Sequence, residues 1–211
     1  MKDKREFRRR VSRWVVIFVG AAVLIGASFC LDPAVRNWVT RHQDPAMRRV
    51  MEAVSRYGDW PEHVALGVIL LAAAWSRGSK RWMRIFAAMI VACALAGGSA
   101  RVVKIAAGRA RPNVQTETRW NGPQLSERYH AFPSGHTAAS TAFFATLVLA
   151  GWRIGGGLFA IPLLIAFSRM YVAAHYLSDV VAAAIIGVAC AYVVVGWRPL
   201  AIKNGKSKVE N

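Results

Sequence analysis

FPSGHTAASTAFFATLVLAGW, residues 132–152, joins a polar turn to a long apolar run. The turn Pro133-Ser134-Gly135 opens directly into the apolar residues, which is typical of a helix start capped by Ser134. The free backbone N–H groups of such a start bind anions readily. His136 lies beside them and is the proton carrier best matched to neutral pH. Because a Ser-Gly start is also a common ordinary cap, its meaning depends on the rest of the chain.

The composition of the chain indicates a membrane protein with basic flanks. Its 211 residues leave room for one domain, 1–211, and 55% of them are hydrophobic although the formal net charge is +17. A nucleic-acid-binding protein would carry such a charge on a soluble surface, so we expect no nucleic-acid partner. The three cysteines lie within apolar blocks and lack a CxxC spacing, which favours neither a zinc site nor a disulfide framework.

Six apolar blocks recur along the chain, each near the length that a helix needs to cross a bilayer. They are residues 14–31, 61–76, 85–100, 135–152, 154–168 and 180–197. A basic segment, 1–13, precedes the first block and a basic tail, 198–211, follows the last, so we expect both termini in the cytoplasm. A cleaved signal peptide is the alternative for the N-terminus, but its cleavage pattern is poor here. These blocks predict an all-α fold, a bundle of six transmembrane helices.

The segment between the first two blocks is polar and contains helix signals. Asp32-Pro33 and Asp44-Pro45 are turn or helix-start signals. Over residues 45–58, apolar residues recur at helical spacing between charged ones, which predicts an amphipathic helix at the membrane surface. Packing of this helix against other protein is the alternative. Further along, the helical pattern of the third block continues to about Gly108, and that of the fifth continues past Arg169.

The expected topology brings three polar groups to the same, outer end of the helices. They are Lys104…Arg109-Ala110-Arg111-Pro112, Pro133-Ser134-Gly135-His136 and Ser168-Arg169…His175…Asp179. Charged groups near hydrocarbon are costly and usually mark function. Lys104, Arg111 and Arg169 would repel one another unless an anion lay among them, and a phosphate suits both guanidinium and ammonium groups. The alternative for each cation taken alone is snorkelling to the lipid headgroups.

His175 and Asp179 are four residues apart and would share one face of a helix. Asp179 would accept a hydrogen bond from one imidazole nitrogen and leave the other free as a nucleophile for phosphorus. His136 would protonate the leaving oxygen and then activate water to break the phosphohistidine. Ser134 and the N–H groups of Gly135 and His136 would hold the phosphate oxygens. The alternative is a simple helix-start pair, in which Asp179 favours the positive end of the last helix.

Three spaced motifs resemble, position for position, the signature of the type 2 phosphatidic acid phosphatase (PAP2) family: Lys104-x6-Arg111-Pro112, Pro133-Ser134-Gly135-His136 and Ser168-Arg169-x5-His175-x3-Asp179. The resemblance implies a metal-independent membrane lipid phosphatase, without cofactor, in an all-helical fold shared with soluble vanadium haloperoxidases. It implies that the nucleophile, general acid and orienting acid are His175, His136 and Asp179. It also implies that phosphate is bound by Lys104, Arg111, Ser134, Gly135 and Arg169.

Members that look like this chain include undecaprenyl diphosphate, phosphatidylglycerophosphate and lipid A 1-phosphate phosphatases. We therefore expect hydrolysis of a phosphomonoester or pyrophosphate of a membrane lipid through a phosphohistidine. The expected place is the outer leaflet of a bacterial inner membrane, with the site facing the periplasm. The expected partners are the lipid substrate and the bilayer, with no obligate protein partner.

Two further functions are compatible with the same residues: a lipid-linked phosphotransferase, and a non-catalytic binder or transporter of anionic lipids. Binding alone would need no second histidine, which disfavours the latter. The loop 113–131 could recognise a headgroup through Arg119 and Arg128. Trp120 in this loop is equally suited to anchoring at the membrane interface.

Overall fold

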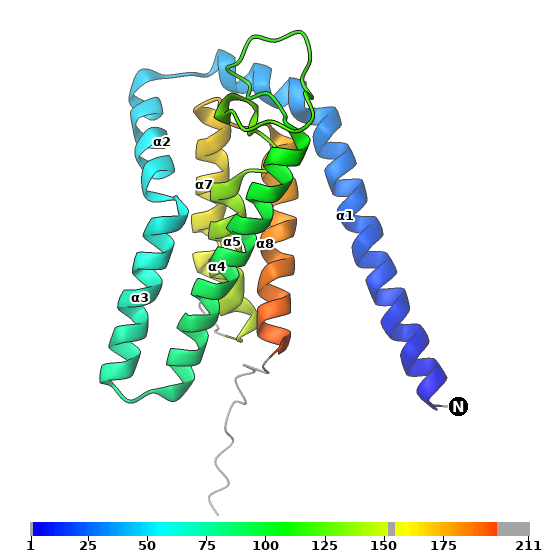
Figure 1. Cartoon of the computed structure of the whole chain (residues 1–211), viewed down its shortest axis with the longest axis vertical. Coiled ribbons are helices and arrows are strands. Elements are labelled where there is room, and N and C mark those ends of the chain that lie inside the picture. Colours follow the sequence, from blue (N-terminus) through cyan, green and yellow to red (C-terminus); the bar gives the residue numbers. More distant parts are fainter. Residues whose placement is uncertain (1, 152–154, 198–211) are drawn as a thin grey trace, which may run out of the picture.

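The computed structural model describes residues 2–151 and 155–197 and is a bundle of helices (Figure 1). The helices are α1 (Lys2–Arg41), α2 (Pro45–Tyr57), α3 (Trp60–Ser76), α4 (Lys80–Ala107), the 3-10 turn η1 (Glu127–Tyr129), α5 (Gly135–Leu149), α6 (Gly155–Leu158), α7 (Ala160–Tyr171) and α8 (Leu177–Trp197). Within the described residues, β structure is limited to one isolated bridge between Arg109 and Trp120. The prediction of an all-α fold is confirmed. The basic tail 198–211 lies outside the described residues.

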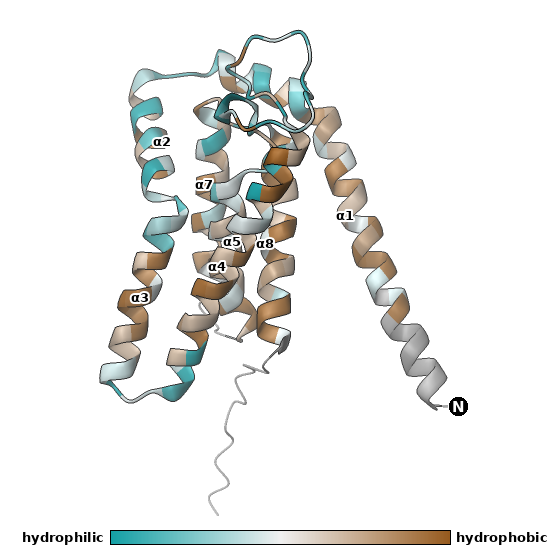
Figure 2. Ribbon diagram, viewed as in Figure 1, coloured by the Kyte–Doolittle hydropathy of each residue, from teal (hydrophilic) through white to brown (hydrophobic). Residues whose placement is uncertain are grey.

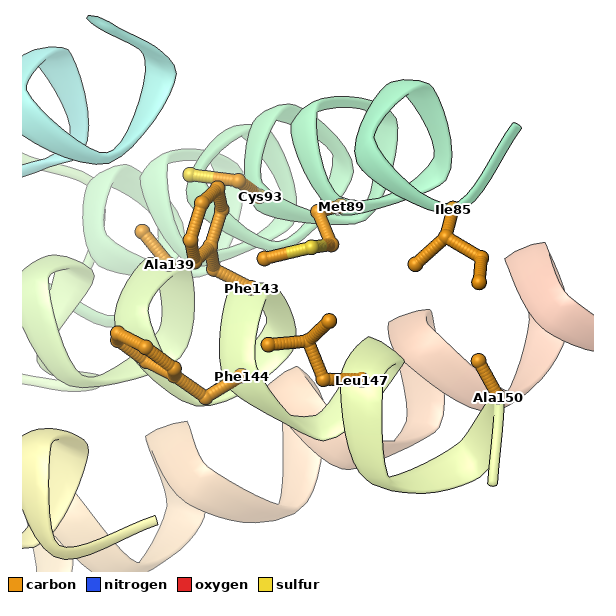
Figure 3. Packing of buried hydrophobic residues seen from close by; sticks show 8 residues of the cluster. All are labelled: Ile85, Met89, Cys93, Ala139, Phe143, Phe144, Leu147 and Ala150. Atoms are coloured by element: carbon orange, nitrogen blue, oxygen red, sulfur yellow. The ribbon is translucent and has the colours of Figure 1, made fainter. Parts of the chain in front are cut away.

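The central helix of the bundle is α5, which contacts α3, α4, α7 and α8. Residues 137–147 of this helix are all buried. Its Phe143 lies against Met89 and Cys93 of α4, together with Leu147 (Figure 3). A second cluster, dominated by alanine, is formed by Ala92, Ala96, Ala100, Ala138, Ala142, Ala183 and Cys190. Such small residues let neighbouring helices approach closely, so α5 is held firmly between α4 and α8.

Three segments are long and apolar enough to cross a membrane: Trp14–Arg41, Lys80–Ala107 and Leu177–Gly196. The chain is therefore an integral membrane protein. Figure 2 shows the hydrophobic residues along the middle of the bundle and the hydrophilic ones toward its two ends, in α2, in the loop after α4 and at the α3–α4 connection.

The predicted bundle of six spans is not confirmed. Helices occupy all six predicted positions, but α5 has 15 residues and α7 has 12. At 1.5 Å per residue, α5 is about 22 Å long, less than the roughly 30 Å of a hydrocarbon core. A turn at residues 150–151 ends α5 before its apolar run ends, and a turn at Phe159 separates α7 from the short helix α6.

The prediction of a turn or helix start at Asp32-Pro33 is wrong, because α1 continues through Pro33 to Arg41. Proline inside a helix removes a hydrogen bond and usually bends the helix. In Figure 1 the last part of α1 turns to run across the top of the bundle. This part packs on the protein, since Val39 is buried with Met51 of α2 and Tyr171 of α7. Tertiary contacts thus offset the local cost of the proline.

The predicted amphipathic helix is α2, which begins at the predicted start signal. Asp44 caps it by accepting the N–H of Met47 at 2.8 Å. Its buried residues, Met51 and Ser55, lie on the side that packs against α7. The alternative of packing against protein therefore holds for this face, and the position of α2 at a membrane surface stays a prediction.

Candidate active site

The three predicted polar groups lie at the same end of the bundle. Lys104 is in the last turn of α4, and Arg169 is in the last turn of α7. Ser134 caps the start of α5, and His175 shortly precedes the start of α8. The loop 108–134 lies over this end of the bundle (Figure 1). Two helices therefore end where two others begin, which brings together residues far apart in the sequence.

Lys104 lies directly beside the start of α5. Its Nζ is 3.2 Å from the position that a Cβ on Gly135 would occupy. Ser134 caps this helix, with its Oγ 3.5 Å from the N–H of Thr137 and 3.0 Å from the hydroxyl of the same residue. The first N–H groups of a helix have no partner within it and carry the positive end of its dipole. Glycine at 135 therefore leaves open the space between the ammonium and these N–H groups.

Lys104, Arg111 and Arg169 all interact electrostatically with both imidazoles, those of His136 and His175. Among the described residues, the buried Nε atoms of Arg111 and Arg169 lack a hydrogen-bond partner. Burial lowers the pKa of Arg111, as expected for a cation held away from water. Three close cations with unused donors suit an anionic ligand.

His175 lies in the turn between α7 and α8 and not on a helix, so the helical reading of its spacing to Asp179 is wrong. The two side chains nevertheless meet, with 3.6 Å between His175 Nδ1 and Asp179 Oδ2. A shorter contact, 2.6 Å, joins Nδ1 to the carbonyl oxygen of Ala131. Since a carbonyl can only accept, this contact assigns the proton to Nδ1 and leaves Nε2 unprotonated. The backbone of Ala131 is therefore the main acceptor for His175, with Asp179 as a longer contact.

The buried position of His175 keeps its imidazole neutral. Burial lowers its pKa well below the usual value, and the charges of Lys104, Arg169 and Arg111 lower it further. The hydrogen bond to the Ala131 carbonyl acts in the opposite direction but is the smaller effect. A neutral imidazole with a free Nε2 is the form that a nucleophile requires.

Asp179 is held by a buried network that the sequence did not reveal. Its Oδ2 accepts the N–H of Tyr176 at 2.7 Å, and its Oδ1 accepts Nη1 of Arg109 at 2.5 Å. Arg109 also donates through Nη2 to Oδ2 of Asp32 in α1 at 2.6 Å. Ser178 completes the network, donating its N–H at 2.8 Å and its hydroxyl at 2.6 Å to Asp32. Asp32 and Arg109 thus fix the carboxylate that faces His175.

The sequence analysis gave Arg109 no individual role and interpreted Asp32 as part of a turn or helix-start signal. Only 2% of each residue is exposed, and the Arg109 guanidinium lies 4.3 Å from the ring centroid of Tyr176 and 5.0 Å from that of Trp120. The sequence did contain one signal for Asp32, which directly follows the first apolar block. A carboxylate in that position needs a partner. The loop residue Trp120 packs over Arg109 although 46% of it is exposed, and Arg119 is exposed as well.

His136 opens onto a cavity between α2, α3 and α7. The cavity is lined by Glu52, Ser55, Arg56, Asp59, Glu62, His136, Arg169 and Val172. A second cavity, within the loop 108–134, is lined by Arg111, Asn113, Val114, Glu127 and Arg128. The cations of the site thus reach two openings, one beside α2 and one in the loop.

Comparisons with known proteins agree with this architecture. Residues 82–203 match the model of the PAP2 superfamily. A lipid A 1-phosphatase of Rhizobium etli is 28% identical over 159 residues, which cover 67% of this chain and 67% of that protein. The crystal structure of a transmembrane PAP2-type phosphatidylglycerolphosphate phosphatase from Bacillus subtilis aligns with a TM-score of 0.63 at 18% identity, covering 90% of this chain and 98% of that one. LpxE of Aquifex aeolicus aligns with a TM-score of 0.56 at 20% identity, covering 79% and 95%.

Proposed function

The chain belongs to the PAP2 superfamily, as its motifs predict, and on this premise we propose that it is a membrane lipid phosphatase. It removes a terminal phosphate from a lipid phosphomonoester or diphosphate through a phosphohistidine at His175. The observation that carries this proposal is the buried His175, whose Nδ1 is committed to the Ala131 carbonyl while three cations act on its ring.

The proposed reaction has two steps. Nε2 of His175 attacks phosphorus while the bond to the lipid oxygen breaks, and His136 gives that oxygen a proton. Water then attacks the phosphohistidine and gives a proton to His136, so that inorganic phosphate leaves and both imidazoles return to their first state. Lys104, Arg111 and Arg169, with the N–H groups after Ser134, stabilise the charge on the phosphate oxygens in both steps. Because these groups neutralise the phosphate, we expect activity in the presence of EDTA.

The likeness to the Rhizobium etli lipid A 1-phosphatase favours a lipid A-type 1-phosphate as the substrate. Undecaprenyl diphosphate and phosphatidylglycerophosphate also carry a terminal phosphate, and both are alternative substrates for the assay. We propose that the site faces the outer leaflet and that both termini are cytoplasmic. The α3–α4 connection, whose basic flanks lie at the opposite end of the bundle from the site, supports this orientation (Figure 2).

The experiment that tests the proposed function is a phosphate-release assay on these lipids, with purified protein in detergent and EDTA. The variant His175→Ala should lose activity by at least about 10³-fold, as expected for a nucleophile. His42→Ala is the matched control, because His42 is exposed at the end of α1 and should keep full activity. With a ³²P-labelled lipid, quenching should trap an acid-labile phosphoenzyme that the His175 variant does not form. Full activity of that variant, or label on another residue, would contradict the proposal.

A further inference from the structure

A carboxylate lies beside the second imidazole of the site. Asp59 Oδ1 is 3.4 Å from His136 Nδ1, and both residues line the cavity next to α2. We propose that Asp59 is the positioning residue of the general acid, holding a proton on Nδ1 of His136 so that Nε2 exchanges protons with substrate and water. This inference rests on the proposed function and extends it to a residue outside the three signature motifs.

The electrostatics of the site give such a group a function. The charged or titratable groups that act on His136 are Arg169, His175, Lys104 and Arg111, in addition to Asp59. Burial, which is the largest effect, and the cations among these groups both disfavour the protonated imidazole that a general acid needs. Asp179 is already bonded to Arg109 and to the N–H of Tyr176. Within the described part of the chain, Asp59 is the carboxylate at ion-pair distance from His136, and a carboxylate there favours the imidazolium.

The fold holds Asp59 in place without help from a ligand. Asp59 caps α3, with Oδ1 accepting the N–H of Trp60 at 2.8 Å. Its backbone oxygen is 2.6 Å from Nδ1 of His63, which is buried in the bundle. The preceding residue, Gly58, packs so closely on α7 that a Cβ there would lie 2.7 Å from the Ile165 side chain. The joint between α2 and α3 therefore brings the carboxylate to the mouth of the cavity.

Asp59 acts by selecting the tautomer of His136. In the first step the lipid oxygen takes the Nε2 proton while its bond to phosphorus breaks and His175 bonds to phosphorus. The proton that remains on His136 stays on Nδ1, which faces Asp59. Nε2 is then free to take a proton from the water that breaks the phosphohistidine. Without the carboxylate, the remaining proton can occupy Nε2, and the imidazole is then unable to act as the base.

The test compares Asp59→Asn with the matched control Glu62→Gln. Asparagine caps a helix as well as aspartate does, so α3 keeps its start. Glu62 lines the same cavity, so its substitution removes the same charge from the same opening. Two substrates distinguish a role in protonating the leaving group from a general loss of activity. One is a short-chain phosphatidic acid, whose alkoxide must be protonated to leave, and the other is 4-nitrophenyl phosphate, whose phenolate leaves without a proton. The quantity to compare is kcat/KM, because it reports the step in which the leaving group departs.

For Asp59→Asn we expect kcat/KM to fall about 10²-fold on phosphatidic acid and less than about 5-fold on 4-nitrophenyl phosphate, since general acid catalysis contributes on the order of 10²–10⁴. Glu62→Gln should change neither value by more than about 2-fold, as expected for a rim charge screened by solvent. Equal losses on the two substrates, no loss, or an equal effect of the Glu62 variant would overturn the inference.

Folding is checked by thermal unfolding in detergent, and Asp59→Ser, which also caps a helix, replaces Asp59→Asn if that variant is unfolded. Unfolding of both variants would assign the carboxylate to structure alone and overturn the inference. A wild-type protein that releases no phosphate would contradict the proposed function itself. An active wild type with an inactive His175→Ala, but without discrimination by Asp59→Asn, would contradict only the role of Asp59.

Discussion

Arg109 donates a hydrogen bond of 2.5 Å from Nη1 to Oδ1 of Asp179, across 70 residues of sequence. The same guanidinium holds Asp32 of α1, so one buried cation joins the loop after α4 to two helices. The carboxylate that faces His175 is therefore fixed by two residues that the signature does not specify, Arg109 at a variable position of the first motif and Asp32 outside all three. The arrangement of the catalytic residues therefore depends on α1 as well as on α4, α5, α7 and α8.

Replacing Arg109 should destabilise the whole catalytic end. Arg109→Met leaves Asp32 and Asp179 buried without their cation, which we expect to cost about 3–5 kcal/mol of unfolding free energy. Denaturation in detergent micelles measures this. Arg119→Met is the control, because Arg119 lies over the same Tyr176 ring but is exposed, and it should change stability by less than about 0.5 kcal/mol. Similar unfolding midpoints for the two variants would show that the network is not needed for stability.

His175 should remain neutral at pH values where an ordinary histidine is protonated. Its pKa is lowered by burial and by neighbouring cations, so the imidazole stays unprotonated as the pH falls through the usual value of about 6.5. The unfolded chain binds that proton and the folded chain does not, so unfolding free energy should decrease as the pH falls below about 6.5. Titration of ¹⁵N-histidine signals in the free protein checks the lowered pKa. A His175 signal that titrates near the usual value would refute it.

A methyl group at position 135 should interfere with phosphate binding and leave the fold intact. The Cβ of Gly135→Ala would lie 3.2 Å from Lys104 Nζ, at the end of a flexible side chain that can move away. We expect kcat/KM to fall about 10-fold or more, equivalent to about 1.4 kcal/mol, with little change in thermal stability. Gly98→Ala in α4, which has open space around it, is the control and should keep its activity. An unchanged kcat/KM in Gly135→Ala would show that the bound phosphate does not use the space beside Gly135.

Ser55 should matter for substrate binding although it lies on α2, outside every motif. Its hydroxyl accepts a hydrogen bond from Nη1 of Arg169. Ser55→Ala removes this anchor, and we expect KM to rise about 5-fold while kcat changes less, because the hydrogen bond contributes about 1 kcal/mol to placing the cation in both ground and transition states. Steady-state kinetics on the lipid substrate measures the split. Ser76→Ala, at an exposed position in α3 bonded only to its own helix, is the control; an equal effect there would contradict the role of Ser55.

Much of the fold could be read from local patterns. Capping residues and apolar runs predicted the start of α2 at Asp44-Pro45 and the start of α5 at Ser134, and Gly108 ends α4 in the left-handed conformation that suits glycine. These features depend on interactions within a few residues. The lengths of α5 and α7 were overestimated, because an apolar run does not record the residue at which a turn stops the helix.

The sequence by itself determined that the chain is helical and apolar. It also determined that two histidines, an aspartate and three cations occur at the spacings of the PAP2 signature. Only the tertiary structure decided that Ala131 accepts the hydrogen bond of His175, that Asp32 and Arg109 hold Asp179, and that Asp59 meets His136. The physical reason is that one partner is a backbone carbonyl, which every residue type has, and the others are side chains tens of residues away in the sequence. Their meeting depends on where helices end and how closely they pack, and such contacts leave no periodic trace in the sequence.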